Sequence, residues 1–240
     1  MASSIMVYHF LSWSGDELDS GHYLGRVGVY GVSFFYILSG LTLFIVYKKS
    51  MALKRGVVSF VIKRVFRILP LLWLVTIAYA LVIKPRPTGL DMALNLSGLF
   101  GFVDPAGYIA TGAWSIGNEM VFYAFFPFFL YLERKNVWIF YFFIASVFAT
   151  GVFFAFYVLN RDVSLADEWN LYVNPFNQFY LFAGGVLMGH LHERFPFRLP
   201  HFLALIMVIS LVLLFCIYPQ SGDLILMVTS WNRVLFSLIC

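Results

Sequence analysis

Long runs of apolar residues, separated by short polar connectors, form most of the chain. A helix that crosses the hydrocarbon core of a bilayer needs about 20 apolar residues. Blocks of this kind therefore predict membrane-spanning helices, in which every backbone polar group is satisfied internally. We expect an all-α polytopic bundle of about eight membrane segments, the first and last incomplete: residues 5–13, 27–47, 64–83, 114–132, 137–159, 175–191, 202–218 and 224–240.

Residues 90–112 differ from these segments because polar residues and glycines interrupt them, as at Asp91, Asn95 and Asp104. We interpret this stretch as a half-helix or interfacial segment. The sequence holds no long repeat and no soluble domain, so residues 1–240 are expected to form one membrane domain. The first run has nine residues, too few to span a membrane, and we expect the chain to begin inside its first helix.

Composition supports a lipid environment. Hydrophobic residues make up 61% of the chain and charged residues 12%, against about 25% charged in soluble domains. The net charge of +4 does not indicate nucleic acid, because the cations cluster beside apolar segments, where they orient a chain in a bilayer. Cys216 and Cys240 lie in apolar segments without the spacing of metal ligands, so no metal site is expected.

The distribution of cations predicts the orientation. With the connector at 48–63 placed in the cytoplasm, eleven cations face inward and four outward. The inner set is Lys48, Lys49, Lys54, Arg55, Lys63, Arg64, Arg67, Arg134, Lys135, Arg194 and Arg198, and the outer set is Arg26, Lys84, Arg86 and Arg161. Cytoplasmic loops are enriched in Lys and Arg, which favours this orientation. Arg233 falls within the last segment and is either buried or paired with a carboxylate.

Arg64 and Arg67 are three residues apart, so on a helix they project from nearly the same face. Two guanidiniums stacked in this way suit a phosphate-bearing ligand. The alternative is an orienting anchor whose side chains snorkel to the interface.

Ionisable residues inside spans are costly to bury and are therefore candidates for function. Glu119 lies near the outer end of its helix, with Ser115 four residues before it and Tyr123 four residues after it. The three form one polar stripe on an aromatic helix. The alternative is a hydrogen bond that only packs two helices together.

His9 is the second candidate, because a neutral imidazole tolerates apolar surroundings and can act as a general base near pH 7. The alternative is a core histidine that donates to a carbonyl. His22 is a competing base in a loop. His190 and His192 are two residues apart and point to different sides of a helix, so they make a poor metal pair.

Four motifs together resemble the acyltransferase-3 family. They are Gly-Val-Tyr-Gly-Val-Ser-Phe-Phe-Tyr-Ile-Leu-Ser-Gly ending at Gly40, Arg-x-x-Arg-Ile-Leu-Pro ending at Pro70, Trp-Ser-x-x-x-Glu-x-x-x-Tyr from Trp114 to Tyr123 with Pro127, and Phe-Tyr-Leu-Phe-Ala-Gly-Gly ending at Gly185. The resemblance runs from His9 to about Gly189.

Members of that family are multi-pass membrane enzymes, mostly bacterial, that move acetyl or other short acyl groups from cytoplasmic acyl-coenzyme A to hydroxyls of surface polysaccharides or lipid-linked sugars. The resemblance implies that His9 and Glu119 are catalytic and that Arg64 and Arg67 bind the donor. It makes Trp114, Ser115 and Tyr123 supporting residues. No permanently bound cofactor is implied, and the expected location is the bacterial inner membrane.

The family pattern also has an arginine eleven positions before the histidine, which here would precede Met1, and about two more helices after the last one counted here. We therefore expect a chain truncated at both ends. The expected donor path runs about 20 residues, or roughly 30 Å, from Arg64 to the outer end of its helix. There His9 would act as a base or carry the acyl group, and Glu119 would orient the imidazole or bind the sugar.

A membrane transporter with its substrate at mid-membrane is the alternative from another class, and the broken segment at 90–112 would fit it. An inactive fragment is a third possibility. No inverted repeat is visible between the halves of the chain, which favours the enzyme over the transporter.

Overall fold

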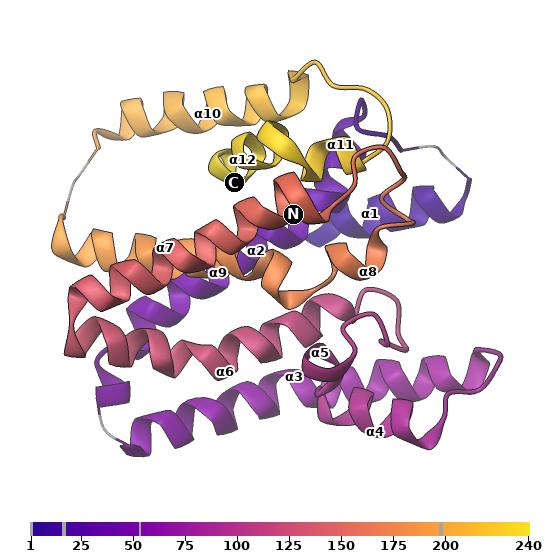
Figure 1. Cartoon of the computed structure of the whole chain (residues 1–240), viewed down its shortest axis with the longest axis horizontal. Coiled ribbons are helices and arrows are strands. Elements are labelled where there is room, and N and C mark those ends of the chain that lie inside the picture. The colour runs from indigo at the N-terminus through magenta and orange to yellow at the C-terminus, as the bar shows by residue number, and fades with distance from the viewer. Residues whose placement is uncertain (1, 16–17, 53, 197–198) are drawn as a thin grey trace.

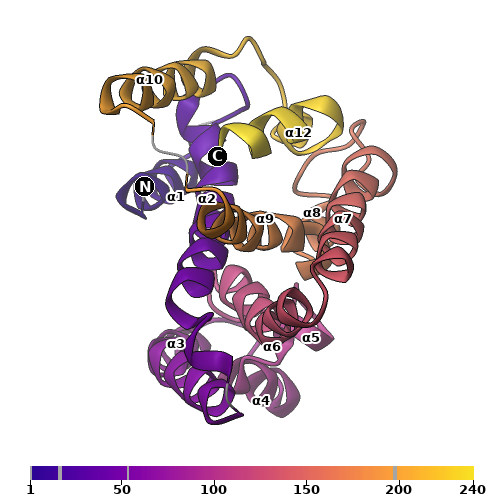
Figure 2. The same ribbon diagram turned by 90° about the vertical axis from the view of Figure 1, so that its left-hand side faces the viewer.

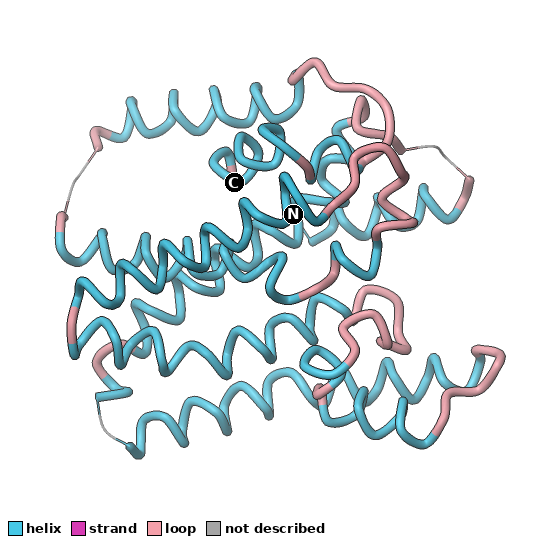
Figure 3. The backbone as a smooth tube through the Cα atoms, viewed as in Figure 1, coloured by secondary structure: helices cyan, strands magenta, loops and turns pink. Residues whose placement is uncertain are grey.

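The structure is a computed structural model that describes residues 2–15, 18–52, 54–196 and 199–240. Within these ranges every regular element is a helix, which confirms the all-α prediction (Figure 3). In chain order they are α1 (Ala2–Trp13), α2 (Tyr23–Tyr47), the 3-10 turn η1 (Ser50–Ala52), α3 (Lys54–Val82), α4 (Gly89–Ser97), α5 (Phe100–Val103), α6 (Trp114–Lys135), α7 (Val137–Phe153), the π-helical turn η2 (Phe154–Val158), α8 (Trp169–Tyr172), α9 (Pro175–Arg194), α10 (His201–Ile217), α11 (Ile225–Val228) and α12 (Ser230–Ile239).

Four of these helices are long and apolar enough to cross a membrane: α2, α3, α6, and α7 together with η2. The α10 helix is apolar but has only 17 residues. The expected segment at 224–240 is wrong as one continuous helix, because Thr229 is extended and Ser230 has a φ of 54°, which separates α11 from α12. Residues 90–112 form the short helices α4 and α5, as the interrupted pattern indicates. A total of eight membrane segments stays a prediction.

The α9 helix lies in the middle of the bundle, between α2 and α7 (Figure 2). It begins at Asn174, whose side chain accepts a hydrogen bond from the Phe176 amide, and at Pro175, whose missing N–H costs nothing in the first turn. Gly40 of α2 and Gly185 of α9 allow the two helices to meet backbone to backbone. A Cβ added at Gly185 would overlap the Ile37 carbonyl oxygen and lie 2.8 Å from the Leu41 nitrogen.

Aromatic rings fill the space between α6 and α9. The Phe122 ring stacks on Phe179 and Phe182 at 5.3 and 5.4 Å between centroids, and Phe129 meets Phe179 edge-on at 5.6 Å. Offset and edge-on pairs of this kind are the favoured aromatic geometries. They fix the rotation of α6 and so decide which of its residues face α2 and α3.

A polar cluster joins the ends of α2, α6 and α9 on one side of the molecule, at the left in Figure 1. Lys48 contacts Glu133 at 2.9 Å and Glu193 at 2.6 Å, and His190 contacts the same Glu133 oxygen at 3.1 Å. Burial lowers the pKa of Lys48, but its hydrogen bonds to Glu193 and Glu133 outweigh that effect and raise the pKa above its usual value. The predicted inner ends of three helices therefore do share one end of the bundle. Arg198, counted among the inner cations, lies outside the described residues.

Two arginines are buried and are held by carbonyl groups. Arg233 is 4% exposed and donates to the Asn177 and Val228 carbonyl oxygens and to the Tyr180 hydroxyl. Arg26, counted in the sequence as an outer cation, is 2% exposed near the start of α2. It donates to four close carbonyl oxygens, those of Ser20, Phe215, Cys216 and Tyr218, at 2.6–3.1 Å. Phe215 and Cys216 belong to the last turn of α10, where helix carbonyls lack partners and a cation is favourable.

Candidate active site

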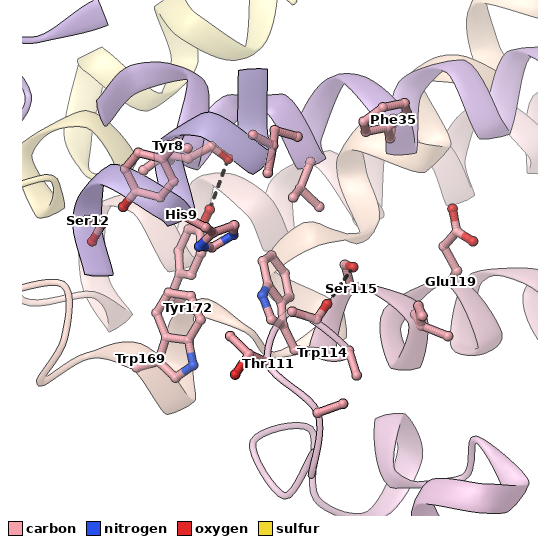
Figure 4. A pocket seen from close by; sticks show the side chains of 18 of the residues that line it. Tyr8, His9, Ser12, Phe35, Thr111, Trp114, Ser115, Glu119, Trp169 and Tyr172 are labelled. Atoms are coloured by element: carbon pink, nitrogen blue, oxygen red, sulfur yellow. Dashed lines mark hydrogen bonds between the residues drawn. The ribbon is translucent and has the colours of Figure 1, made fainter. Parts of the chain in front are cut away.

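A cavity of about 580 Å³ lies between α1, α2, α6, α8 and the loop that precedes α6 (Figure 4). Most of its wall is apolar or aromatic, as is usual for a pocket that binds a small molecule. The hydroxyl, imidazole and carboxylate groups among its lining residues are those of Tyr8, His9, Ser12, Tyr36, Thr111, Ser115, Glu119 and Tyr172. The structure therefore brings His9 into one cavity with Trp114, Ser115 and Glu119, which follow it by more than 100 residues in the sequence.

His9 is half-buried on α1, and its ring lies 5.7 Å from that of Trp13, one turn along the helix. Among the described residues, none forms a hydrogen bond with its imidazole. Both ring nitrogens are thus unoccupied by protein groups, unlike those of His190, which contacts Tyr141 and Glu133. The competing base His22 is exposed in the loop before α2 and contacts Asp19 at 2.8 Å. An imidazole that is free of protein partners at a cavity wall is available to a substrate.

Glu119 lies at the opposite end of the cavity from His9 in Figure 4, and no hydrogen bond between the two is present among the described residues. The Glu119 carboxylate instead accepts a hydrogen bond from the Tyr123 hydroxyl at 3.0 Å. The third member of the expected polar stripe, Ser115, donates to the Gly112 carbonyl at 2.9 Å. Glu119 therefore does not orient the His9 imidazole through a direct hydrogen bond, and its carboxylate is available to contact a bound substrate.

Arg64 and Arg67 differ in their surroundings, although both lie on α3. The guanidinium of Arg64 is half-buried over the rings of Tyr47 and Tyr123, at 5.3 and 5.6 Å from their centroids. Arg67 is exposed. Tyr123 connects Arg64 to the carboxylate, because the guanidinium lies over its ring and its hydroxyl donates to Glu119. The α6 helix brings Tyr123 against Arg64, one turn from Glu119, whereas the donor path from Arg64 to His9, at the other end of the cavity, stays a prediction.

Three aromatic residues pack together where α6 meets α8. Trp114 is buried, and its ring lies 5.7 Å from Trp169 and 5.8 Å from Tyr172. The indole nitrogen of Trp169 donates to the Tyr108 hydroxyl at 2.8 Å. Sequence reasoning missed Trp169 and Tyr172 as wall residues, because they stand in a short polar connector that reads as a loop. The pair of aromatic residues in that connector was the available signal.

The comparisons with known proteins agree with this arrangement. A family model described as an acyltransferase domain matches residues 2–240, nearly the whole chain. The chain belongs to the acyltransferase-3 family. No curated protein and no solved structure matches it.

The family is one of membrane acyltransferases, in keeping with the four helices among the described residues that are long and apolar enough to cross a membrane. The structure explains physically why the motifs that resemble this family are present. Gly40 and Gly185 end two of them and form the tight contact between α2 and α9. The motif from Trp114 to Tyr123 supplies one wall of the cavity.

Proposed function

We propose that this protein transfers an acetyl or other short acyl group from cytoplasmic acyl-coenzyme A to a hydroxyl of a surface polysaccharide or a lipid-linked sugar. The proposal places the protein in the inner membrane of a bacterium. The observation that carries it is a cavity lined by Glu119 and by an imidazole with which none of the described residues forms a hydrogen bond, with Arg64 over the ring of the Tyr123 that donates to Glu119. Family membership favours this enzyme over a transporter.

In the proposed reaction His9 accepts the proton of the acceptor hydroxyl while the oxygen attacks the thioester carbonyl carbon. The new C–O bond forms and the C–S bond breaks, and the departing thiolate takes the proton from the imidazolium. A covalent route, in which the His9 nitrogen first receives the acyl group and then passes it to the hydroxyl, uses the same geometry and stays an alternative.

The donor would lie against α3. Arg67 is exposed and offers a planar fork of donors to a phosphate of coenzyme A, and Arg64 adds positive charge deeper in the bundle. The narrow pantetheine arm would then run past Glu119 into the cavity.

The aromatic residues around His9 support a sugar as the acceptor. The C–H faces of a sugar ring pack against aromatic side chains, and Trp169 and Tyr172 present rings to the cavity that contains His9. Ser12, on α1, and Thr111, in the loop before α6, also line this cavity, and their hydroxyls can form hydrogen bonds with those of a sugar.

The test replaces His9 by Ala and measures transfer of labelled acetyl from acetyl-coenzyme A to glycan in membranes that contain the protein. We expect a loss of about 10²- to 10⁴-fold, the usual contribution of a general base. The matched control is His22→Ala, which removes an exposed histidine that contacts only Asp19 in the described part of the chain. Retained transfer in His9→Ala, or an equal loss in both variants, would refute the assignment.

A further inference from the structure

A chain of hydrogen bonds connects α2 to the cavity through α6. The Ser39 hydroxyl of α2 lies 3.2 Å from the Tyr123 hydroxyl, and Tyr123 lies 3.0 Å from Glu119 Oε2. Tyr123 is 8% exposed and Ser39 is half-buried, so both bonds are partly buried. Glu119 is the member of this chain that reaches the cavity wall.

The chemistry of the three groups fixes the direction of the bonds. An ionised carboxylate can only accept, and a tyrosine has a single hydroxyl proton. Tyr123 donates its one hydrogen bond to Glu119, so Ser39 must donate to the Tyr123 oxygen. The order is Ser39 to Tyr123 to Glu119.

Ser39 does not form the hydrogen bond that its helix offers by default. A serine or threonine inside a helix commonly donates back to the carbonyl four residues earlier. Thr42, one turn further along α2, does so, to the Leu38 carbonyl at 2.7 Å. The Ser39 hydroxyl is directed to the neighbouring helix instead, with Tyr123 as its partner.

The Tyr123 ring also lies against a cation. The Arg64 guanidinium is 5.6 Å from the ring centroid, within the range of a cation–π contact. Arg64 is itself held by the Tyr47 hydroxyl at 3.3 Å. A cation over the ring draws electron density from the phenol and makes its hydroxyl a stronger donor to Glu119.

We propose that Ser39 is a positioning residue: through Tyr123 it holds Glu119 Oε2, so that the other carboxylate oxygen, Oε1, is left to face the substrate in the cavity. The consequence for catalysis rests on the proposed function. The position of the Glu119 carboxylate does not depend on the proposed function, because it follows from the two hydrogen bonds alone.

The kinetic test uses Ser39→Ala, with Ser39→Thr as the variant that restores a hydroxyl. Ser39→Ala removes a hydrogen bond between two neutral hydroxyls, a loss that corresponds to about a 2- to 10-fold fall in kcat. We expect a fall in this range for Ser39→Ala, an unchanged KM for acetyl-coenzyme A, and recovery in Ser39→Thr. The matched control is Thr42→Val, which removes an exposed hydroxyl from the same helix and is expected to keep full activity.

A double-mutant cycle then separates positioning from a general structural effect. If Ser39 acts through Glu119, the change Ser39→Ala has no further effect on kcat in a Glu119→Gln background. If the two losses multiply, Ser39 acts independently of Glu119 and the proposal is overturned.

An infrared measurement tests the chain without relying on activity. The carboxyl stretching band of Glu119 is identified as the band lost in Glu119→Gln, and its frequency reports the hydrogen bonds that the group accepts. We expect the band to shift in Ser39→Ala and to stay in place in Thr42→Val. An unmoved band in Ser39→Ala overturns the proposal. Should the unmutated protein transfer no acetyl group, the proposed function fails, and the infrared result still decides the role of Ser39.

Discussion

Adjacent glycines of α9 provide a direct test of the packing that positions the site. A methyl group added at Gly185 would overlap backbone atoms of α2, with the Leu41 nitrogen at 2.8 Å and the Ile37 carbonyl carbon at 2.9 Å. One added at Gly184 would meet only the end of the Phe148 ring, at 3.5 Å, an ordinary contact. We predict that Gly185→Ala destabilises the protein and that Gly184→Ala does not.

The magnitude follows from these contacts. Overpacking costs about 1–3 kcal/mol, and the upper value applies at Gly185 because a helix backbone cannot rotate away as a side chain can. Alanine regains about 1 kcal/mol through its better helix propensity, which leaves a net loss of about 2 kcal/mol. For a protein of this size that is a fall of about 4–8 °C in Tm. Gly184→Ala keeps the gain without the clash, so its Tm is expected to be unchanged or slightly raised.

The assay heats the purified protein in detergent and measures the folded fraction that remains in solution at each temperature. The reasoning is refuted if both variants shift Tm by the same amount, or if Gly185→Ala leaves it unchanged. Either result would mean that α2 and α9 do not meet backbone to backbone.

Three further predictions concern the donor, the inner polar cluster and the acceptor. Arg67→Ala is expected to raise the KM for acetyl-coenzyme A about tenfold with little change in kcat, whereas Arg64→Ala lowers kcat as well, because Arg64 also lies over the Tyr123 ring; equal effects in steady-state kinetics would contradict this. Glu133→Ala removes the acceptor shared by Lys48 and His190 and should cost about 2–3 kcal/mol in thermal unfolding, and an unchanged Tm would show that the cluster contributes nothing. Trp169→Ala should raise the KM for the glycan at least about fivefold and leave the KM for acetyl-coenzyme A unchanged. Steady-state kinetics with each substrate varied in turn measures both values, and an unchanged KM for the glycan would contradict the prediction.

Much of the fold could be predicted from the sequence, because a lipid environment permits few structures. The apolar blocks located α2, α3, α6 and α7, and the interrupted stretch at 90–112, interpreted as a half-helix or interfacial segment, contains the short helices α4 and α5. The prediction of one continuous helix at 224–240 was wrong. The segment is as hydrophobic as a single span, but Ser230 has a left-handed backbone conformation that divides it into two helices. The hydrophobicity of a segment indicates that it is surrounded by apolar groups, but it does not show where one residue changes the direction of the chain.

The site shows a similar division. The polar stripe on α6 pointed to Glu119, and its periodicity also predicted its contact with Tyr123. The separation of Arg64 from that stripe could not be predicted, because it depends on how α3 and α6 are aligned in depth. Ser39 was missed as a partner for the same reason: its spacing along α2 says nothing about the helix that it faces.

The carbonyl groups that surround Arg26 limit the order in which parts of the molecule can be assembled. Four of the oxygens within reach of this side chain come from residues 215–220, about 190 positions later in the chain. While the ribosome is still making the intervening helices, the guanidinium has only the nearby Ser20 and Gly21 carbonyls and water to solvate it. We therefore expect α2 to stay in the translocon or at the bilayer surface, with the Arg26 guanidinium at its start still in contact with water. Insertion of α10, among whose described residues none is buried, would then close that end of the protein.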